Sequence, residues 1–206
     1  MRESSPEVVE GVRGNRAFLA RAVRHLAGER GIRQFLDIGT GLPAAVLVHA
    51  RALMQGDPRG RTSYLEADLR DPASILGHPA LTETLDLSRP VGLLLVAILH
   101  FLHDDEQAAA VVAELLAALP AGSHLVLSHG TMDFSSPPGI AAYEKMYAAG
   151  GTDVRARTKT QIAAYLAGLE IVEPGIVPVS DWRPEDPAAR QVTDDLGIYG
   201  MVARKP

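Results

Sequence analysis

Short runs of apolar residues alternate with amphipathic stretches along most of this chain. The runs have the length and the apolar character of strands buried in a sheet. The amphipathic stretches repeat apolar residues every three or four positions, as helices that pack on a sheet do. The predicted strands are 35–38, 62–65, 90–99, 123–128, 169–172, 176–179 and 198–203, and the predicted helices are 15–29, 46–55, 106–119, 139–149 and 158–167. This alternation predicts an open α/β sheet.

The last two predicted strands break the alternation. No helix is predicted between 176–179 and 198–203, whereas parallel strands need a crossover connection that is usually helical. We therefore expect these two strands to pair antiparallel and to close an otherwise mostly parallel sheet.

The apolar run at 35–38 leads directly into residues that suit ligand binding. Asp37 stands at its end, and Gly39, Thr40 and Gly41 follow at once. Glycines permit positive φ angles and leave no Cβ between the backbone and a ligand. In an open α/β sheet, ligands bind outside the carboxyl ends of the strands. The stretch predicts a nucleotide site, although a buried strand followed by an ordinary glycine turn would have the same pattern.

The glycine spacing bears on which nucleotide binds. A dinucleotide fingerprint reads G-x-G-x-x-G, and the third glycine is replaced here by Ala44. A carboxylate such as Asp37 would also face a pyrophosphate, whereas it suits a cationic ligand. The stretch D-I-G-T-G resembles the first motif of class I S-adenosylmethionine-dependent methyltransferases, in which this acid lies near the methionine ammonium group.

Too few residues separate the first two predicted strands. A β-α-β unit takes roughly 30 residues or more, and only residues 39–60, 22 in all, lie between Ile38 and Arg61. A methyltransferase sheet needs two crossovers here with a strand between them. We expect a segment to be missing between Pro43 and Val46. Either the chain has lost it, or the printed sequence omits it; we favour the omission.

Charge and composition narrow the classes of function. The 206 residues carry a formal net charge of −5 and no basic run, which argues against nonspecific nucleic-acid binding because that needs clustered Lys and Arg. No cysteine is present, so disulfides and thiol nucleophiles are excluded. No apolar stretch reaches about 18 residues, and the N-terminus lacks the apolar core of a signal peptide. We expect one domain over residues 1–206, in the cytoplasm, with no nucleic-acid or membrane partner.

A second acid follows the predicted strand at 62–65. Asp68 precedes Asp71 and Pro72, which are typical of the start of a helix. Because the carboxyl ends of parallel strands share one edge of the sheet, Asp68 would lie beside Asp37. Capping of a turn is an equal alternative for Asp68.

Three histidines follow the ends of predicted strands. His100 and His103 come after the longest apolar run, and His129 comes after the next strand. A histidine with an ordinary pKa can take a proton at neutral pH, so each is a candidate base. A solvated position at a helix start explains His103 better, whereas catalysis and structure are equal alternatives for His100 and His129. A metal site built from His100, His103 and Asp104 is disfavoured, and we expect no metal.

Five motifs follow one another along the chain: D-I-G-T-G-L-P, E-A-D-L-R-D-P, A-I-L-H-F-L-H-D, S-H-G-T and V-S-D-W-R-P. Together they resemble the S-adenosyl methyltransferase family of high-GC bacteria, formerly a domain of unknown function, over about 15–205. The resemblance implies the class I methyltransferase fold, a doubly wound, mostly parallel Rossmann-like sheet with a terminal antiparallel hairpin, here without its second strand. It also implies S-adenosyl-L-methionine as cofactor and a small-molecule methyl acceptor.

The resemblance assigns residues to the parts of the cofactor. It places Asp37, Gly39, Thr40 and Gly41 around the methionine part, Asp68 and Leu69 at the adenine, and Ala97, Ile98 and His100 along the cofactor or the methyl path. His100 and His129 are the candidate catalytic bases. Trp182 would either wall the acceptor pocket or pack on the sheet edge. Tyr143 and Tyr147 lie one helical turn apart, a spacing more typical of packing than of an acceptor lid.

One departure from the family keeps other functions open. Its members carry an acid after the second strand that binds the ribose hydroxyls, and no residue here matches it. This favours an alternative, a non-catalytic module that binds the cofactor or a partner. A short-chain nicotinamide oxidoreductase is the weakest hypothesis, because its Tyr-x-x-x-Lys pair does not occur. The sequence identifies neither the acceptor nor the oligomeric state.

Overall fold

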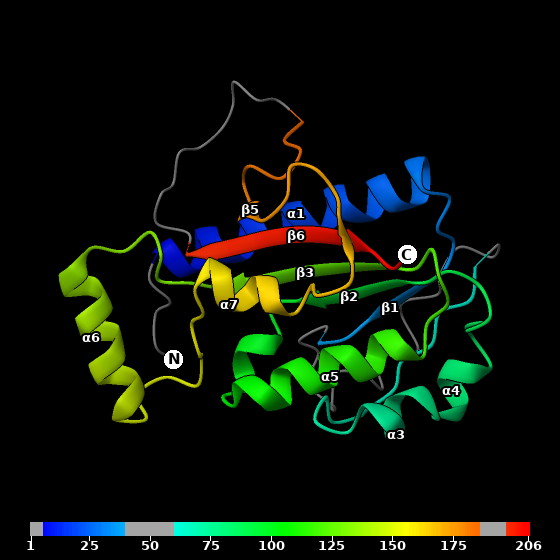
Figure 1. The fold of residues 1–206 in the computed structure, drawn as a ribbon, viewed down its shortest axis with the longest axis horizontal. Helices are drawn as coiled ribbons and strands as arrows, with labels where there is room; N and C mark the ends of the chain where they lie inside the picture. The colour runs from blue at the N-terminus through cyan, green and yellow to red at the C-terminus, as the bar shows by residue number, and fades with distance from the viewer. Residues whose placement is uncertain (1–5, 40–59, 186–196) are drawn as a thin grey trace.

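The computed structural model describes residues 6–39, 60–185 and 197–206 and contains one mixed sheet (Figure 1). Its six strands are β1 (Phe35–Asp37), β2 (Gly92–Val96), β3 (His124–Gly130), β4 (Glu170–Ile171), β5 (Val177–Pro178) and β6 (Ile198–Arg204). They lie in the order β1-β2-β3-β6-β4, and β5 also pairs with β6. β1, β2 and β3 are parallel, whereas β6 is antiparallel to β3, β4 and β5. The predicted α/β sheet with antiparallel strands at its end is confirmed.

The described helices are α1 (Pro6–Glu29), α3 (Pro72–Leu76), α4 (Pro79–Thr82), α5 (Asp105–Ala117), α6 (Pro137–Ala148) and α7 (Lys159–Ala164), with a 3₁₀ turn η1 (Leu99–Phe101). Helices α5, α6 and α7 begin and end close to the predicted positions, α3 begins where predicted, and the short helix α4 was not predicted. Helix α1 begins well before the predicted residue 15. The predicted helix at 46–55 lies outside the described residues. The predicted strand at 62–65 is wrong: residues 61–63 are exposed, and β2 is the only described strand that pairs with β1.

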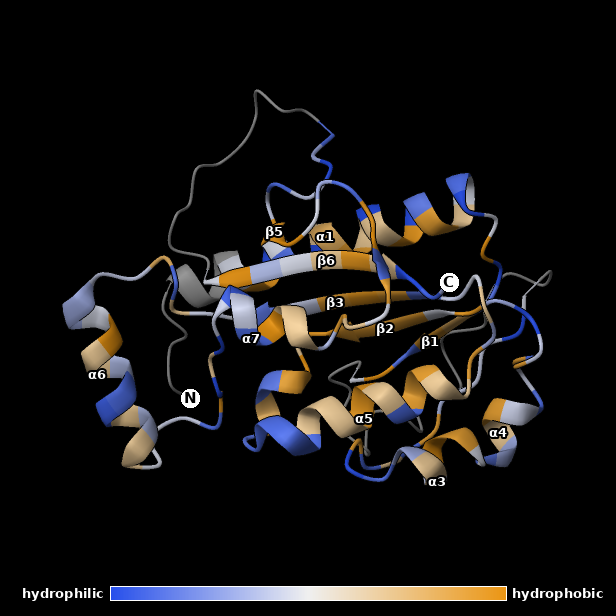
Figure 2. Cartoon of the chain, viewed as in Figure 1, coloured by the Kyte–Doolittle hydropathy of each residue, from blue (hydrophilic) through white to orange (hydrophobic). Residues whose placement is uncertain are grey.

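Side chains of the central strands alternate between two cores. Leu94 on β2 and Val126 on β3 pack with the apolar side of α1. Leu93 and Leu125, next to them in sequence, pack with α3, α4 and α5 on the other face. Figure 2 shows the apolar character of these strands between the two layers of helices. The sheet is therefore buried on both faces, which explains the continuous apolar runs.

The parallel strands give the sheet two chemically different edges. We call the side where β1–β3 end the carboxyl edge, with residues 37–39, 97–101 and 129–131. We call the side where they begin the amino edge, with residues 30–34, 89–91 and 122–124. β6 runs the other way, so Arg204 at its end pairs with His124 at the amino edge. Helix α6 has no buried residue and stands away from the sheet (Figure 1).

None of the helices within the described ranges is both long enough and apolar enough to cross a membrane.

Candidate functional site

Gly39 and Ile98 meet at the carboxyl edge. Gly39 has φ +89°, and a Cβ at this position would lie 2.8 Å from Ile98 Cδ1. The turn therefore needs glycine both for its backbone angle and for the space. The Ile38 amide donates to the Leu94 carbonyl at 3.0 Å, which extends the β1–β2 pairing to the turn. The structure thus brings Gly39 and Ile98 together, whereas Thr40 and Gly41 lie outside the described residues.

Ala97 holds an unusual backbone conformation at the end of β2. Its φ is +54°, a region that costs a residue with a Cβ roughly 1–2 kcal/mol. Its amide donates both to the Ser128 carbonyl at 3.2 Å and to Ser128 Oγ at 3.0 Å. Backbone strain of this kind collects at functional sites, where the surroundings maintain it. The geometry supports Ala97 as part of a binding edge.

Asp37 presents a carboxylate that no described cation neutralises. Its side chain is exposed at the end of β1, and no ion pair joins it to any residue in the described ranges. The neighbouring protein still desolvates the carboxyl enough to raise its pKa. An accessible, unpaired acid beside a glycine turn suits a cationic group of a ligand.

Asp68 differs from Asp37, because Arg70 forms hydrogen bonds to both of its carboxylate oxygens. Arg70 donates from its backbone N and from Nε to Oδ1, both at 2.9 Å, and from Nη2 to Oδ2 at 2.7 Å. These hydrogen bonds from Arg70 lower the pKa of Asp68. Leu69 between them packs against the core of the α5 face. An adenine amino group would have to compete with Arg70 for the Asp68 oxygens.

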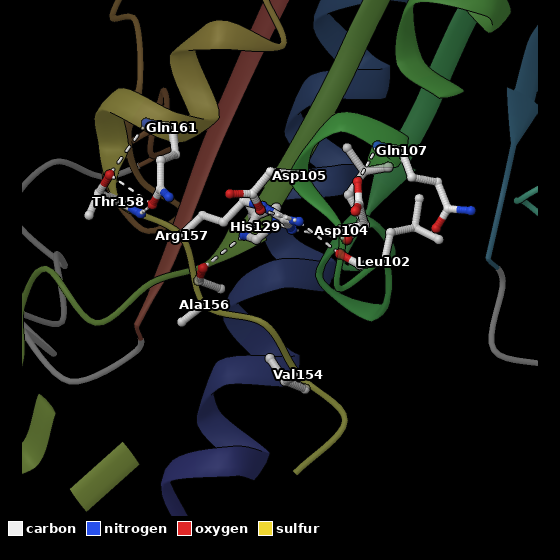
Figure 3. A network of polar contacts seen from close by, with 12 residues as sticks. Leu102, Asp104, Asp105, Gln107, His129, Val154, Ala156, Arg157, Thr158 and Gln161 are labelled. Carbon is white, nitrogen blue, oxygen red and sulfur yellow. Dashed lines mark hydrogen bonds and ion pairs between the residues drawn. The ribbon is translucent and has the colours of Figure 1, made fainter. Parts of the chain in front are cut away.

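Arg157 is a buried arginine that the sequence did not indicate as a site residue, and it connects the remaining segments at the carboxyl edge (Figure 3). The Arg157 side chain is fully buried and forms an ion pair with Asp105 at 2.8 Å. It also donates to the carbonyls of Leu99 at 3.3 Å and Leu102 at 2.8 Å. Its Nη1 lies 3.0 Å from His129 Nε2. Arg157 therefore ties the loop after β2 to the end of β3 and the start of α5.

The hydrogen bonds of His129 define its protonation state. Its Nδ1 lies 2.8 Å from the Gly130 carbonyl, which can only accept, so Nδ1 carries the proton. Nε2 then accepts from Arg157, which can only donate. Burial lowers the pKa of His129 to about 4. Because both ring nitrogens are engaged, His129 has no free ring nitrogen that could accept a substrate proton in this structure.

His100 differs from His129, because one of its ring nitrogens is unpaired in the described part of the chain. Its Nδ1 is buried without a hydrogen-bond partner among the described residues. Burial, with a smaller contribution from Arg157, lowers the pKa of His100 to about 4, so the ring is neutral at pH 7. The Arg155 amide donates to the His100 carbonyl at 2.7 Å and fixes its backbone. His103 next to it is exposed and lies with Nε2 2.9 Å from the Asp153 carbonyl, so it holds the neighbouring segment in place.

The three aromatic candidates, Trp182, Tyr143 and Tyr147, make packing and hydrogen-bond contacts within the described residues, which indicates structural roles. Trp182 is completely buried against α1, with its ring 5.5 Å from that of Phe18, so its interpretation as a pocket wall is wrong. The Tyr143 hydroxyl donates to the Val154 carbonyl at 2.7 Å and anchors α6. Tyr147 stacks on Tyr143 with ring centroids 5.9 Å apart. No three His, Asp or Glu side chains of the described ranges gather as metal ligands would.

Comparison with known protein families gives one match over the whole chain. The profile of a family described as S-adenosyl methyltransferase matches in two parts, residues 1–46 and 44–206. The two parts meet where the sequence predicts a missing segment. No curated protein matches the chain.

Two solved structures are similar along nearly all of the chain. A DUF574 family protein from Streptomyces avermitilis MA-4680 shares 42% sequence identity with a TM-score of 0.88, covering 98% of this chain and 86% of that protein. A protein from Thermobifida fusca YX, provisionally assigned as a methyltransferase, shares 33% identity with a TM-score of 0.83, covering 97% and 83%. TnmH, at 18% identity and a TM-score of 0.56 over 97% of this chain and 57% of its own, is similar in fold alone.

Proposed function

We propose, since the chain belongs to the S-adenosyl methyltransferase family, that it transfers a methyl group from S-adenosyl-L-methionine to a small-molecule acceptor. The observation that carries this proposal is the arrangement at the carboxyl edge. There the Gly39 backbone approaches Ile98 without room for a Cβ, and the exposed carboxylate of Asp37 has no described counter-ion. This arrangement suits a ligand that carries a cationic group against a backbone cradle.

The residues present fit the methionine end of the cofactor better than its nucleoside end. Asp37 would balance the ammonium group, and the Gly39 turn would let the backbone approach it. Asp68 and Leu69 would hold adenine once Arg70 moves aside. No described residue matches the acid that binds ribose in the family, so the fit at the ribose depends on the predicted missing segment.

Bound S-adenosylmethionine would supply a methyl group that its sulfonium already activates. The protein then has to balance charge, align the acceptor and exclude water. Asp37 performs the first task, and the strained Ala97 with Ile98 shapes the wall along which the acceptor approaches. The segment 153–157 closes over the loop after β2 and keeps these groups in place.

His100 is the residue that we place next to the acceptor. A general base works best when its pKa lies near the operating pH, and the pKa of His100 is about 4. The neutral ring is therefore a weak base but a good hydrogen-bond acceptor. This suits an acceptor that has to be oriented more than deprotonated.

A calorimetric titration tests the cofactor class. We expect S-adenosylhomocysteine to bind in the micromolar range and NAD not to bind. Asp37→Asn should weaken binding by about tenfold, the loss of one charge-assisted contact. Glu83→Gln removes an equal charge at an exposed position and serves as the matched control, with unchanged affinity. Failure of wild-type protein to bind S-adenosylhomocysteine would overturn the proposal.

A non-catalytic binding module is the second candidate. It is favoured by the two-part family match and by the absence of a ribose acid among the described residues. The intact mass distinguishes the explanations of the gap, because the printed sequence accounts for 22.0 kDa. A mass well above this value indicates a segment that the printed sequence omits. Methyl transfer to any acceptor excludes the module.

A further inference from the structure

The described residues enclose a hollow of about 270 Å³ at the amino edge, opposite the predicted cofactor site. It is framed by Ile32 before β1, Pro90 before β2 and Gly122 before β3. The length of β2 separates the two edges by a distance on the order of 15 Å. The C-terminal ends of α1 and of the chain lie on this side of the sheet (Figure 1). The hollow is therefore distinct from the site proposed above.

Four arginines line this hollow, and none of its lining residues is acidic. The four are Arg30, Arg33, Arg89 and Arg204. Arg204 forms an ion pair with Glu170 at 2.8 Å. The other three form no ion pair with a carboxylate of the described ranges. The Asp86 carboxylate hydrogen-bonds to Ser88, and these bonds, with a smaller contribution from the nearby charge of Arg89, lower its pKa. A chain of net charge −5 thus concentrates unpaired guanidinium groups around one small space.

His124 adds an independent sign that the hollow takes a ligand. It lines the space and is only 3% exposed. Neither of its ring nitrogens forms a hydrogen bond of normal geometry with a described residue, although the Gly122 backbone lies near. Buried polar groups in proteins are nearly always hydrogen-bonded. The ring can therefore donate one hydrogen bond to a ligand in the hollow.

We propose that this hollow binds a phosphate group, either free or on a small metabolite. Guanidinium forks match phosphate oxygens with paired hydrogen bonds. A phosphate carries about −1.5 to −2 charges at pH 7, so it matches several unpaired arginines better than a single carboxylate does. Small-molecule pockets typically measure roughly 300–1,000 Å³. At about 270 Å³ this hollow is slightly smaller, which suits a compact anion such as phosphate. The proposal does not rest on the methyltransferase activity.

Calorimetric titration with inorganic phosphate and pyrophosphate tests the site, with acetate as the comparison anion at equal ionic strength. We expect phosphate and pyrophosphate to bind and acetate to bind at least tenfold more weakly. The double variant Arg33→Gln/Arg89→Gln should lose at least tenfold in phosphate affinity, since each arginine provides a charge-assisted contact. The exposed pair Arg13→Gln/Arg16→Gln removes the same charge from α1 and should leave affinity unchanged. Equal losses in the two double variants would show a diffuse charge effect and overturn the proposal.

Nuclear magnetic resonance of the histidine rings locates the anion independently of any change in folding. Phosphate should shift the ring nitrogen signals of His124, which the variant His124→Gln identifies by their loss. His129 on the same strand is the internal control, and its signals should not move. Binding of phosphate that leaves His124 unshifted would overturn the site. Binding of S-adenosylhomocysteine is measured separately, so failure of one proposal leaves the other standing.

Discussion

His124 and His129 occupy opposite ends of one strand, β3, and lie on opposite faces of the sheet. Both are buried, and burial lowers the pKa of each to about 4. His129 nevertheless has a partner for each ring nitrogen, the Gly130 carbonyl and Arg157. Neither ring nitrogen of His124 forms a hydrogen bond of normal geometry with a described residue. The two histidines are therefore similarly buried but differ in whether their ring nitrogens are hydrogen-bonded.

Burial therefore sets the charge of a histidine, whereas its hydrogen-bond partners set its role. His129 is neutral and satisfied, so it serves the architecture of the carboxyl edge. His124 is neutral and unsatisfied beside cationic side chains, so it is available to a ligand. The same contrast separates the two edges, because the Arg157 guanidinium has several hydrogen-bond partners, whereas that of Arg89 forms no hydrogen bond or ion pair within the described ranges.

Removal of Arg157 should produce the largest effect. Arg157→Met leaves Asp105 without its ion pair and leaves the carbonyls of Leu99 and Leu102 without this donor. Loss of one partner of a buried pair costs about 3–5 kcal/mol, and we expect this decrease in the free energy of unfolding in urea. Arg24→Met removes an exposed ion pair with Glu185 and should cost less than about 1 kcal/mol. Similar losses in both variants would show that the network of Arg157 is not stabilising.

Two glycines provide a matched test of the edges. Gly39 and Gly31 both have positive φ, but a Cβ would contact Ile98 at Gly39 and nothing within 4 Å at Gly31. Gly31→Ala should therefore cost only the backbone strain, about 1 kcal/mol. Gly39→Ala should cost about 3 kcal/mol, because overpacking adds to the same strain. Urea unfolding measures both, and equal costs would contradict the close approach of β1 to Ile98.

Acid should destabilise the protein through the three histidines whose pKa burial lowers to about 4, namely His100, His124 and His129. His124 and His129 allow a matched comparison because they lie on one strand. An unfolded histidine titrates near pH 6.5, and His124 and His129 titrate near pH 4 when folded. Between these values the unfolded state binds more protons, so stability is present above pH 6.5 and is lost as the pH falls toward 4. From pH 7 to pH 5 each ring should account for about 2 kcal/mol of the free energy of unfolding.

Leucine variants assign this acid sensitivity to the two ends of β3. His124→Leu and His129→Leu should each remove about 2 kcal/mol of the pH dependence. At pH 7 only His129→Leu should destabilise, by about 1–3 kcal/mol, because it leaves a buried Arg157 N–H without its acceptor, whereas the Gly130 carbonyl keeps the hydrogen bond from the Arg157 amide. Urea unfolding at pH 7 and pH 5 measures all four quantities. An equal cost at pH 7 would remove the distinction between the two histidines.

Local patterns predicted most of the fold. Apolar runs located β1, β2 and β3, and the Thr158–Gln161 capping box marked the start of α7 as the structure has it. Asp71 and Pro72 began α3 as predicted. The strand predicted at 62–65 does not form among the described residues: Thr62 and Ser63 are polar and exposed, and β-propensity depends on packing against neighbouring strands. The early start of α1 was missed, although Pro6 is typical of a first helical turn.

The site was less predictable because long-range contacts create it. The D-I-G-T-G motif and the expected sheet topology predicted that the glycine turn, Asp37 and Ile98 lie at the carboxyl ends of the strands. The role of Arg157 did not, since its partners are 28 to 58 residues away in sequence and no local pattern marks them. The amino-edge arginines are likewise gathered from both ends of the chain by the sheet order. Residue type indicated candidate bases, but only hydrogen-bond partners separated His100 from His129.

Ala97→Gly should give the smallest effect and the opposite sign. Ala97 keeps φ at +54° through two hydrogen bonds to Ser128, and glycine would relieve roughly 1–2 kcal/mol of strain. The greater freedom of glycine in the unfolded chain offsets about 0.5–1 kcal/mol, so we expect a net gain of about 0.5–1 kcal/mol in urea. Ala118→Gly at the end of α5, where φ is −73°, has no strain to relieve and should be destabilised. If both variants lose free energy of unfolding, Ser128 does not impose strain at the carboxyl edge. The two ends of the sheet would then differ only in the hydrogen-bond partners of their residues.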